Sequence, residues 1–319
     1  MMSSQAELAD RGAVSEAGTG LGARSRVTRR YNRRQMASWW WTAPALLLVL
    51  GFVYVAFLFG AFFAFTNWSG LGSFDFVGFR NFVTFFEDPD AFAALGRTLF
   101  LAAVYVVATN IIGFGLGLAL NRTLKTRHFL RTLIFAPVVL SPLAVSYVWL
   151  YIFDQDGPLN GALEWLGLGS WTRAWLGDPD LAIWAVVIVL VWQHIGLTMV
   201  IYLAGLAGIP PEIEEASAID GASALRRLVH VTLPLLRPTI VVASTLLLVR
   251  GLSIFDQVIA LTGGGPYGAT ETLATLMYKT TFSLGEYGYG AAITMILTIL
   301  IAVFAVLQYK FLRGKPEEI

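Results

Sequence analysis

Long apolar segments alternate with short polar ones along most of this chain. Six of the apolar segments reach the roughly 20 residues that a helix needs to cross the hydrocarbon core of a bilayer. We predict membrane-spanning helices near residues 41–65, 97–121, 130–152, 181–206, 238–262 and 288–312. Pro137 and Pro142 fall within the third span, so we expect that helix to be kinked or locally unwound, with neighbouring helices satisfying the freed backbone groups.

The two ends of the chain are polar. Residues 1–38 are rich in Ala, Gly, Ser and Arg, which predicts a disordered, basic cytoplasmic tail. Residues 39–312 are expected to form one transmembrane domain, and residues 313–319 a short cytoplasmic tail. Within the domain, the loop 207–237 separates the fourth and fifth spans.

Composition supports an all-α membrane protein. Apolar residues make up 56% of the chain and charged residues 13%, and the mean hydropathy is +0.67. Soluble domains carry roughly 25% charged residues, so an ordinary soluble fold is excluded. The chain has no cysteine, which excludes disulfides, thiol catalysis and iron–sulfur sites. Its three histidines are scattered, which argues against a metal site.

Basic residues predict the orientation of the chain. If both termini are cytoplasmic, the cytoplasmic segments carry 17 of the 22 Lys and Arg residues and the outer loops carry four, while Arg250 lies inside a span. This asymmetry follows the positive-inside rule and places the loop 207–237 in the cytoplasm. The basic cluster at 24–34 directly precedes the first span, which favours contact with anionic lipid over nucleic acid.

The loop 207–237 is predicted to contain a short helix, a glycine turn and a second short helix. Pro211 suits a first helical turn, and the acidic residues after it suit the positive end of the helix dipole. Asp220-Gly221 is a turn signal, and Pro234 is expected to stop the second helix. Small residues with acids at one end indicate a docking surface rather than a catalytic site.

This loop resembles the EAA loop of bacterial ABC importer permeases. The resemblance rests on Glu215-Ala216-Ser217, Gly221 and Val231-Thr232-Leu233-Pro234, with Ser217 and Val231 departing conservatively from the usual residues. It implies a type I importer permease with six transmembrane helices, whose loop sits in a cleft of an ATPase subunit. The residues implied in this coupling are Glu214, Glu215, Ala216, Ala218, Asp220, Gly221, Leu233 and Pro234.

A second resemblance extends over roughly residues 40–312. Leu261-Thr262-Gly263-Gly264-Gly265-Pro266, followed by Tyr287-Gly288-Tyr289-Gly290-Ala291, looks like the fifth-loop signature of the first permease of maltose-type and glycerol-3-phosphate-type importers. It implies an ATP-driven importer of a sugar, a di- or oligosaccharide, that works by alternating access in the bacterial cytoplasmic membrane.

The same resemblance implies a set of partners. They are a second, unlike permease, two ATP-binding subunits and an extracytoplasmic solute-binding protein. ATP and Mg would be bound by the ATPase, so the chain is expected to be a transport subunit without an enzymatic site or a cofactor of its own. No nucleic acid is implied.

The run Gly263-Gly264-Gly265-Pro266 admits two interpretations. Glycine amides can bind phosphate, but the chain lacks the Gly-x4-Gly-Lys-Ser/Thr pattern of a nucleotide loop. A sharp turn at the outer end of the fifth span, which lets the chain approach a partner closely, is favoured instead.

Polar and aromatic residues inside the spans are candidates for the substrate path, because their burial in a membrane is costly without a purpose. Asp256 and Gln257 are the leading candidates for hydrogen bonds to sugar hydroxyls, and Phe255 could pack on a sugar face. The other candidates are Tyr147, Trp192 and Gln193. A structural role for Asp256, as a contact to a partner chain or a cap at a kink, remains open.

Two further residues in the spans are expected to be structural. On a continuous helix, Arg250 would lie about 240° around the axis from Asp256, too far for an i,i+4 pair, so Arg250 is assigned to holding helices together. His194 is expected to pack. Gly113 and Gly117 have the small-xxx-small spacing of closely packed helices.

Two other classes of protein remain as alternatives. A proton-coupled carrier usually has titratable relays and repeated halves, whereas this chain has one acidic residue within its spans and no obvious internal repeat. A membrane-embedded enzyme would need convergent catalytic groups within the spans, and we find none. The solute itself is not predictable, although the scarcity of positive charge in the spans favours a neutral sugar over a phosphorylated one.

Overall fold

The computed structural model describes residues 39–122 and 124–312, and the tails expected at 1–38 and 313–319 lie outside the described residues. The secondary structure of the described part is helical, apart from one isolated bridge between Thr66 and Phe76. The chain divides into two compact units, of which the first ends at Leu58 and the second begins at Phe59.

The described part of the first unit is an apolar helical stretch. It consists of Trp39–Val49 (α1), the π-helical Leu50–Val55 (η1) and the beginning of Ala56–Phe63 (α2). The stretch Thr42–Phe63 is long and apolar enough to cross a membrane, in agreement with the first predicted span.

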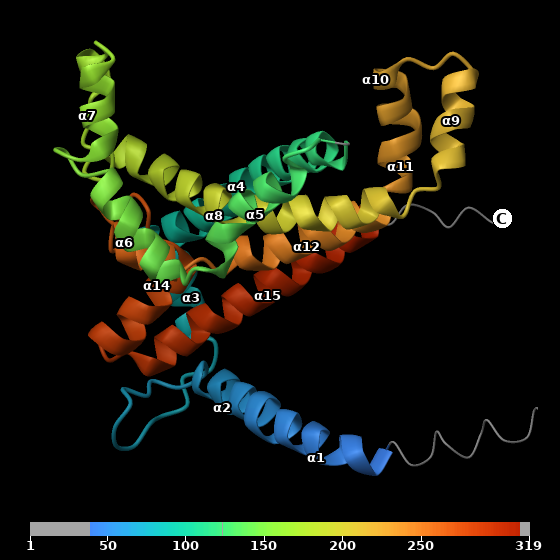
Figure 1. Cartoon of the computed structure of the whole chain (residues 1–319). Coiled ribbons are helices and arrows are strands. Elements are labelled where there is room, and N and C mark those ends of the chain that lie inside the picture. Colours follow the sequence, from blue (N-terminus) through green and yellow to red (C-terminus); the bar gives the residue numbers. More distant parts are fainter. Residues whose placement is uncertain (1–38, 123, 313–319) are drawn as a thin grey trace, which may run out of the picture. The chain divides into compact units, whose positions relative to one another are not determined.

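Three long helices form the frame of the second unit (Figure 1). They are Pro89–Asn121 (α4), Pro179–Ala207 (α8) and Tyr287–Leu312 (α15), and each is long and apolar enough to span a membrane. These helices overlap the ranges predicted for the second, fourth and sixth spans.

Aspartate caps explain why α4 and α8 begin where they do. The side chain of Asp88 accepts a hydrogen bond from the backbone N–H of Asp90, and Pro89 occupies the first helical position. Asp178, Pro179 and Asp180 repeat this arrangement at the start of α8. Because its cap precedes the apolar segment, α4 begins before residue 97, the predicted start of the span.

The third span is sharply bent, as its prolines predict. Arg127–Val139 (α5) and Pro142–Ile152 (α6) meet at 102°. Ser141 caps α6 by accepting a hydrogen bond from the backbone N–H of Ala144 at 3.2 Å. Pro142 takes the first position of α6, which disfavours a helical conformation just before it and separates the two helices.

The fifth span is also broken, and here the prediction of one continuous helix was wrong. Arg237–Leu252 (α12) ends before a short non-helical segment at 253–255, and Asp256–Leu261 (α13) follows. Within the described residues, four helices could each cross a membrane, or up to six if each of two bent pairs is one span: α5 with α6, and Ala224–Leu235 with α12.

The loop between α8 and α12 has the predicted helix, turn and second helix. Pro211–Ile219 (α9) is followed by a turn and by Ala224–Arg227 (α10), Leu228–Thr232 (η3) and Leu233–Leu235 (α11). Pro234 was expected to stop the second helix of the loop. Instead it lies inside α11. The chain instead bends by 70° between Ala224–Leu235 and α12.

The remaining helices are short and lie in the connections between the long ones. They are Arg80–Glu87 (α3), Pro158–Trp165 (α7), Gly169–Trp171 (η2), Leu273–Tyr278 (α14) and Lys279–Ser283 (η4).

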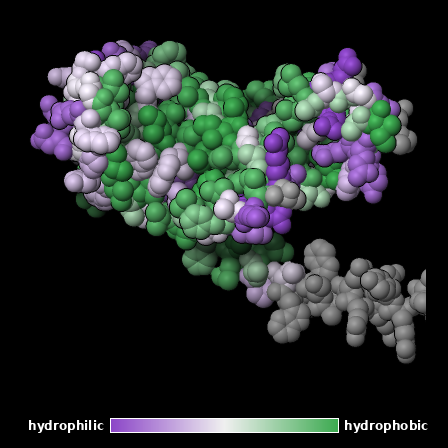
Figure 2. Space-filling model, turned by 45° about the horizontal axis from the view of Figure 1, so that its top comes forward, coloured by the Kyte–Doolittle hydropathy of each residue, from purple (hydrophilic) through white to green (hydrophobic). Residues whose placement is uncertain are grey.

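The most extensive helix packing in the second unit joins α4 to α8. Gly113 and Gly117 of α4 are buried, and a Cβ atom on either glycine would collide with or press against Thr198 or Tyr202 of α8. The predicted small-residue contact therefore exists. Figure 2 shows hydrophobic residues over the middle of one face and hydrophilic residues towards its two ends, the pattern expected of a membrane-spanning bundle.

Candidate functional site

A cavity of about 170 Å³ lies at the break of the fifth span. Three of the predicted substrate-path residues, Phe255, Asp256 and Gln257, line it. The other lining residues come from α4, α6, α8, the end of α12 and the non-helical segment after it, and are Tyr105, Pro142, Leu190, His194, Arg250, Ser253 and Ile254. The cavity therefore lies where the breaks of two spans meet.

The break changes the relation between Arg250 and Asp256. On one continuous helix they would point in different directions, but the non-helical segment at 253–255 turns the chain between them. Both side chains line the same cavity. The argument that separated them was wrong because it assumed an unbroken helix, and Arg250 joins the candidate residues that sequence reasoning had left out.

Gln193 in α8 connects the breaks of the third and fifth spans. Its Nε2 donates a hydrogen bond to the carbonyl oxygen of Leu140 at 3.2 Å, and its Oε1 accepts one from Nε2 of Gln257 at 3.0 Å. The Gln193 side chain is only 2% exposed. It therefore connects the two breaks through these hydrogen bonds, and its role in the substrate path stays a prediction.

The break of the fifth span is stabilised from the other side by Thr272. Its hydroxyl donates a hydrogen bond to the carbonyl oxygen of Ile254 at 3.1 Å. Thr272 and Thr275 form a capping box at the start of α14, and the backbone N–H of Leu273 donates to the hydroxyl of Thr98 at 2.8 Å. Backbone groups freed by a break inside a membrane need such partners, because lipid offers none.

Arg250 has a neutral neighbour rather than an acidic one. One of its guanidinium nitrogens lies 3.3 Å from Nε2 of His194, whose Nδ1 lies 2.9 Å from the carbonyl oxygen of Leu190. Since that carbonyl can only accept, Nδ1 carries the proton and Nε2 accepts from Arg250. The ring of His194 also packs edge-on against Tyr105. His194 thus packs, as predicted, and also orients Arg250.

Two predicted substrate-path residues lie away from this cavity. The Tyr147 side chain is 63% exposed on α6. Trp192 packs edge-on against Trp149, with ring centroids 5.5 Å apart, beside the apolar core. Neither residue lines the cavity. Phe255 lines it and also packs against Tyr278 at 5.2 Å.

The predicted coupling residues lie on a projecting hairpin of helices. Figure 1 shows α9, α10 and α11 at one end of the second unit, away from α6, α7 and α14 at the other. No residue of α9 is buried, and Glu215, Ala216, Ala218 and Asp220 are exposed. A short helix without tertiary burial has little stability of its own, so an additional packing surface is needed.

The turn after α9 depends on Gly221. Its φ is +75°, a conformation that other residues rarely adopt, and its N–H donates to the carbonyl oxygen of Ala218 at 3.1 Å. The two apolar side chains beside the turn are also exposed, Ile219 by 86% and Leu225 by 71%. Sequence reasoning missed these two residues, because an apolar residue in a short helix gives no sign of which way it faces.

A second cavity, of about 590 Å³, lies between this hairpin and the end of α4. Of the predicted coupling residues, Glu214 lines it, together with Ser217. Asn121 and Arg122 line it from the end of α4. The hairpin and the end of α4 therefore border the same open space. Leu233 and Pro234 lie in α11, next to the bend that leads into α12.

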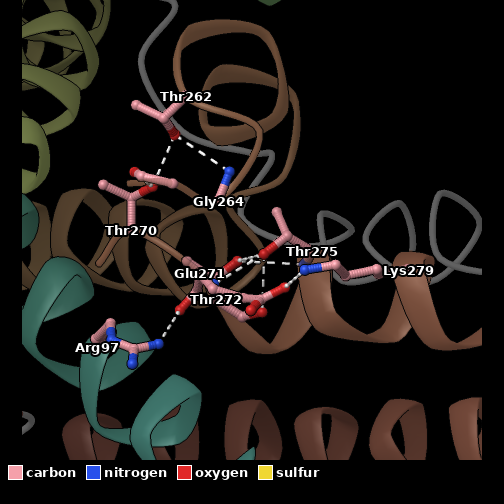
Figure 3. Close-up of polar contacts among 9 residues, drawn as sticks. Arg97, Thr262, Gly264, Thr270, Glu271, Thr272, Thr275 and Lys279 are labelled. Atoms are coloured by element: carbon pink, nitrogen blue, oxygen red, sulfur yellow. Dashed lines mark hydrogen bonds and ion pairs between the residues drawn. The ribbon is translucent and has the colours of Figure 1, made fainter. Parts of the chain in front are cut away.

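The glycine run after α13 forms a compact turn. Gly263 and Gly264 have φ values of +60° and +88°. The N–H of Gly264 donates to the Thr262 hydroxyl, which lies 2.7 Å from the hydroxyl of Thr270 (Figure 3). The turn continues through Gly265 and the cis peptide bond to Pro266. Its backbone amides are partly engaged by threonines rather than gathered around an open anion site.

Charged residues tie this turn to its surroundings. Nζ of Lys279 lies 3.3 Å from a carboxylate oxygen of Glu271, and Arg97 of α4 donates to the carbonyl oxygen of Glu271 at 3.4 Å (Figure 3). The turn is therefore connected to α4 and η4, and it presents Tyr267, which is 98% exposed.

Comparison with known proteins identifies the family. Residues 110–315 match the model of the family described as binding-protein-dependent transport system inner membrane component. The chain belongs to this family.

Among its relatives is the multiple sugar-binding transport system permease protein MsmF of Streptococcus mutans, which is 40% identical over 276 residues that cover 85% of this chain and 94% of MsmF. The trehalose/maltose transport system permease protein MalF of Thermococcus litoralis is 34% identical over 76% of this chain and 81% of its own.

A solved structure supports the same fold. The chain resembles a subunit of a bacterial ABC transporter involved in the import of the acidic polysaccharide alginate, with a TM-score of 0.78 over 89% of this chain and 97% of that one. Their sequences are 22% identical, so this likeness establishes the fold alone. The all-α importer-permease fold predicted from the sequence is confirmed.

Proposed function

We propose that this chain is the transmembrane subunit of an ATP-driven importer that moves a sugar, delivered by an extracytoplasmic binding protein, across the cytoplasmic membrane of a bacterium. The observation that carries the proposal is the 40% identity to a sugar-system permease over 85% of the chain. A di- or oligosaccharide is the favoured cargo, since relatives named for starch degradation products and for trehalose and maltose match over most of the chain.

The cavity at the two helix breaks is the proposed substrate site. Arg250, Asp256 and Gln257 supply hydrogen-bond donors and acceptors, and Phe255 supplies an aromatic surface, which together suit a ligand with many hydroxyls. At about 170 Å³ the cavity is smaller than the roughly 300–1,000 Å³ of a typical small-molecule site. A second, unlike permease subunit would supply the rest of the site.

The exposed helix α9 is the proposed contact with the ATPase. Glu215 would bear the charged contact, Ala216 and Ala218 would allow a close fit, and Gly221 would shape the turn. Two ATPase subunits would bind ATP and Mg, and this chain would hydrolyse nothing itself.

Orientation follows the distribution of basic residues. With the hairpin α9–α11 in the cytoplasm, both termini are cytoplasmic and the turn at 263–266 faces outward. That turn, with exposed Tyr267, would meet the binding protein or the second permease.

Coupling would run through the bent helices. Closure of the ATPase pair on ATP would move α9, and α10 and α11 would pass this movement across the 70° bend into α12. The far end of α12 borders the break at 253–255, so tilting α12 would change the cavity. Hydrolysis would then return the bundle to the inward-open state.

Purification from native membranes tests this proposal. Mild-detergent isolation of the full chain should recover an ATP-binding subunit and a second multi-span permease. Vesicles containing that complex should take up sugar only with ATP and the binding protein. Uptake that continues without ATP and collapses with the proton gradient would contradict the proposal in favour of a secondary carrier.

A further inference from the structure

The connection between α6 and α8 carries an apolar tip that the proposed transport cycle does not use. We define this tip as residues 165–172. Its large apolar residues are highly exposed: Trp165 by 85%, Leu166 by 62%, Leu168 by 43% and Trp171 by 65%. The tip contains no charged residue, whereas the chain just before α7 contains Asp154 and Asp156 and the start of α8 contains Asp178 and Asp180.

At the base of the connection, one buried side-chain amide holds the segment before α7 to the segment before α8. Asn160 is 2% exposed, and its Nδ2 donates to the carbonyl oxygens of Gln155 at 2.9 Å and Arg173 at 3.0 Å. Its Oδ1 accepts from the backbone N–H of Arg173 and from Nε1 of Trp175 at 2.8 Å. Both donors and both acceptor positions of the amide are used, so the two strands of the connection are held together.

The tip has its own defined backbone. α7 ends at Trp165 and is capped by Leu166, and Gly167 after the cap has a φ of +75°. The N–H of Gly167 donates to the carbonyl oxygen of Glu164 at 2.9 Å, and the N–H of Leu168 donates to that of Leu163 at 2.8 Å. This pair of hydrogen bonds is the Schellman ending of a helix. The exposed side chains are therefore carried by an ordered structure rather than by a loose loop.

The direction of α7 suits a membrane surface. Figure 1 shows α7 running across the direction of α8 at the end of the bundle opposite α9–α11. If α8 spans the membrane, α7 runs across the direction of that span at the outer end of the bundle. Tryptophan is enriched at the boundary between lipid and water because its ring is apolar and its N–H is polar.

We propose that the tip at 165–172 inserts into the lipid headgroup region of the outer leaflet and anchors the outer end of the third span. Its aromatic and leucine side chains and its lack of charge fit a lipid interface. A protein partner docking at this end would more naturally use the acidic residues that flank the tip.

Anchoring there has a consequence for the substrate cavity. Asn160 ties the tip to the segment that follows α6, and α6 begins at Pro142, which lines the cavity. Lipid contact therefore sets the angle of the half-span that borders the cavity. This inference needs only a membrane-spanning chain and does not depend on the identity of the transported solute.

Single cysteines test the anchor, since the natural chain contains none. Leu168→Cys and the matched Glu164→Cys, at the one charged residue of α7, each carry one nitroxide label. The full complex is reconstituted in vesicles of phosphatidylethanolamine and phosphatidylglycerol. Collision with oxygen, which concentrates in lipid, is compared with collision with a water-soluble nickel complex.

We expect the label at residue 168 to lie ~5–10 Å into the interface and to be shielded from nickel. The label at residue 164 should stay in water. Equal nickel access at both positions would overturn the proposal. So would shielding of residue 168 that develops only when the binding protein is added, which would assign the tip to a protein partner.

Discussion

The hairpin α9–α11 and the cavity at the helix breaks are both polar interruptions of an apolar chain, but they are built differently. The hairpin is shaped by neighbours in sequence, with Pro211 starting α9, Gly221 turning the chain and Ser223 capping α10. The cavity is shaped by contacts between distant residues, such as Gln193 with Gln257. Local chemistry thus shapes the proposed partner surface, and tertiary contacts shape the proposed substrate site.

The largest effect is expected from Gly221→Pro in the hairpin. Proline cannot adopt the φ of +75°, and it removes the N–H that bonds to Ala218. The strain should exceed about 1 kcal/mol and displace α9, so ATP-driven uptake should fall to background while the chain remains inserted.

The matched control is Gly167→Pro, which strains a glycine of the same φ at the other end of the molecule. ATPase binding, measured by co-purification, should be lost only in the Gly221→Pro protein. Normal uptake by that variant would show that the hairpin does not couple the two subunits.

Gln193→Leu tests whether contacts between distant residues shape the cavity. It leaves the Leu140 carbonyl and the buried Gln257 amide without this partner, and an unsatisfied buried amide costs roughly 1–3 kcal/mol. The thermal unfolding midpoint of the complex should fall. The double variant with Gln257→Leu should cost less than the sum of the two single changes, since the two amides share a bond. If the losses of stability in the two single variants simply add up in the double variant, the hydrogen bond between Gln193 and Gln257 does not stabilise the protein.

Asp256→Asn tests the assignment of the cavity as the substrate site. Loss of a charged hydrogen bond of about 1.5 kcal/mol should reduce uptake by roughly tenfold with the complex still assembled. Asp156→Asn, in the outer connection, is the control and should transport normally. If the Asp256 variant fails to assemble, this carboxylate is a structural contact between subunits instead.

The smallest effect is expected from Tyr147→Ala. Because Tyr147 is exposed and does not line the cavity, uptake should change by less than about twofold, the range of a typical surface substitution. A loss comparable to that of Asp256→Asn would mean that the substrate path extends along the outer face of α6.

The apolar pattern was sufficient to predict the spans and the bend of the third one, since the prolines mark it. The break of the fifth span was not predictable, because Ser253-Ile254-Phe255 contains no helix breaker and is stabilised by Thr272, 18 positions beyond Ile254. Gln193 stands out in the sequence for its polarity, but its hydrogen bonds to Leu140 and Gln257 were not predictable, because both partners are distant in sequence.

The most direct test of the central claim asks what α9 touches. A photo-crosslinker on Ile219→Cys, at the exposed tip of α9, is activated in native membranes that retain uptake, with Leu168→Cys as the control at the opposite end. We predict an adduct between residue 219 and an ATP-binding subunit, and no such adduct from residue 168. Failure of residue 219 to reach any ATP-binding subunit would contradict coupling through α9.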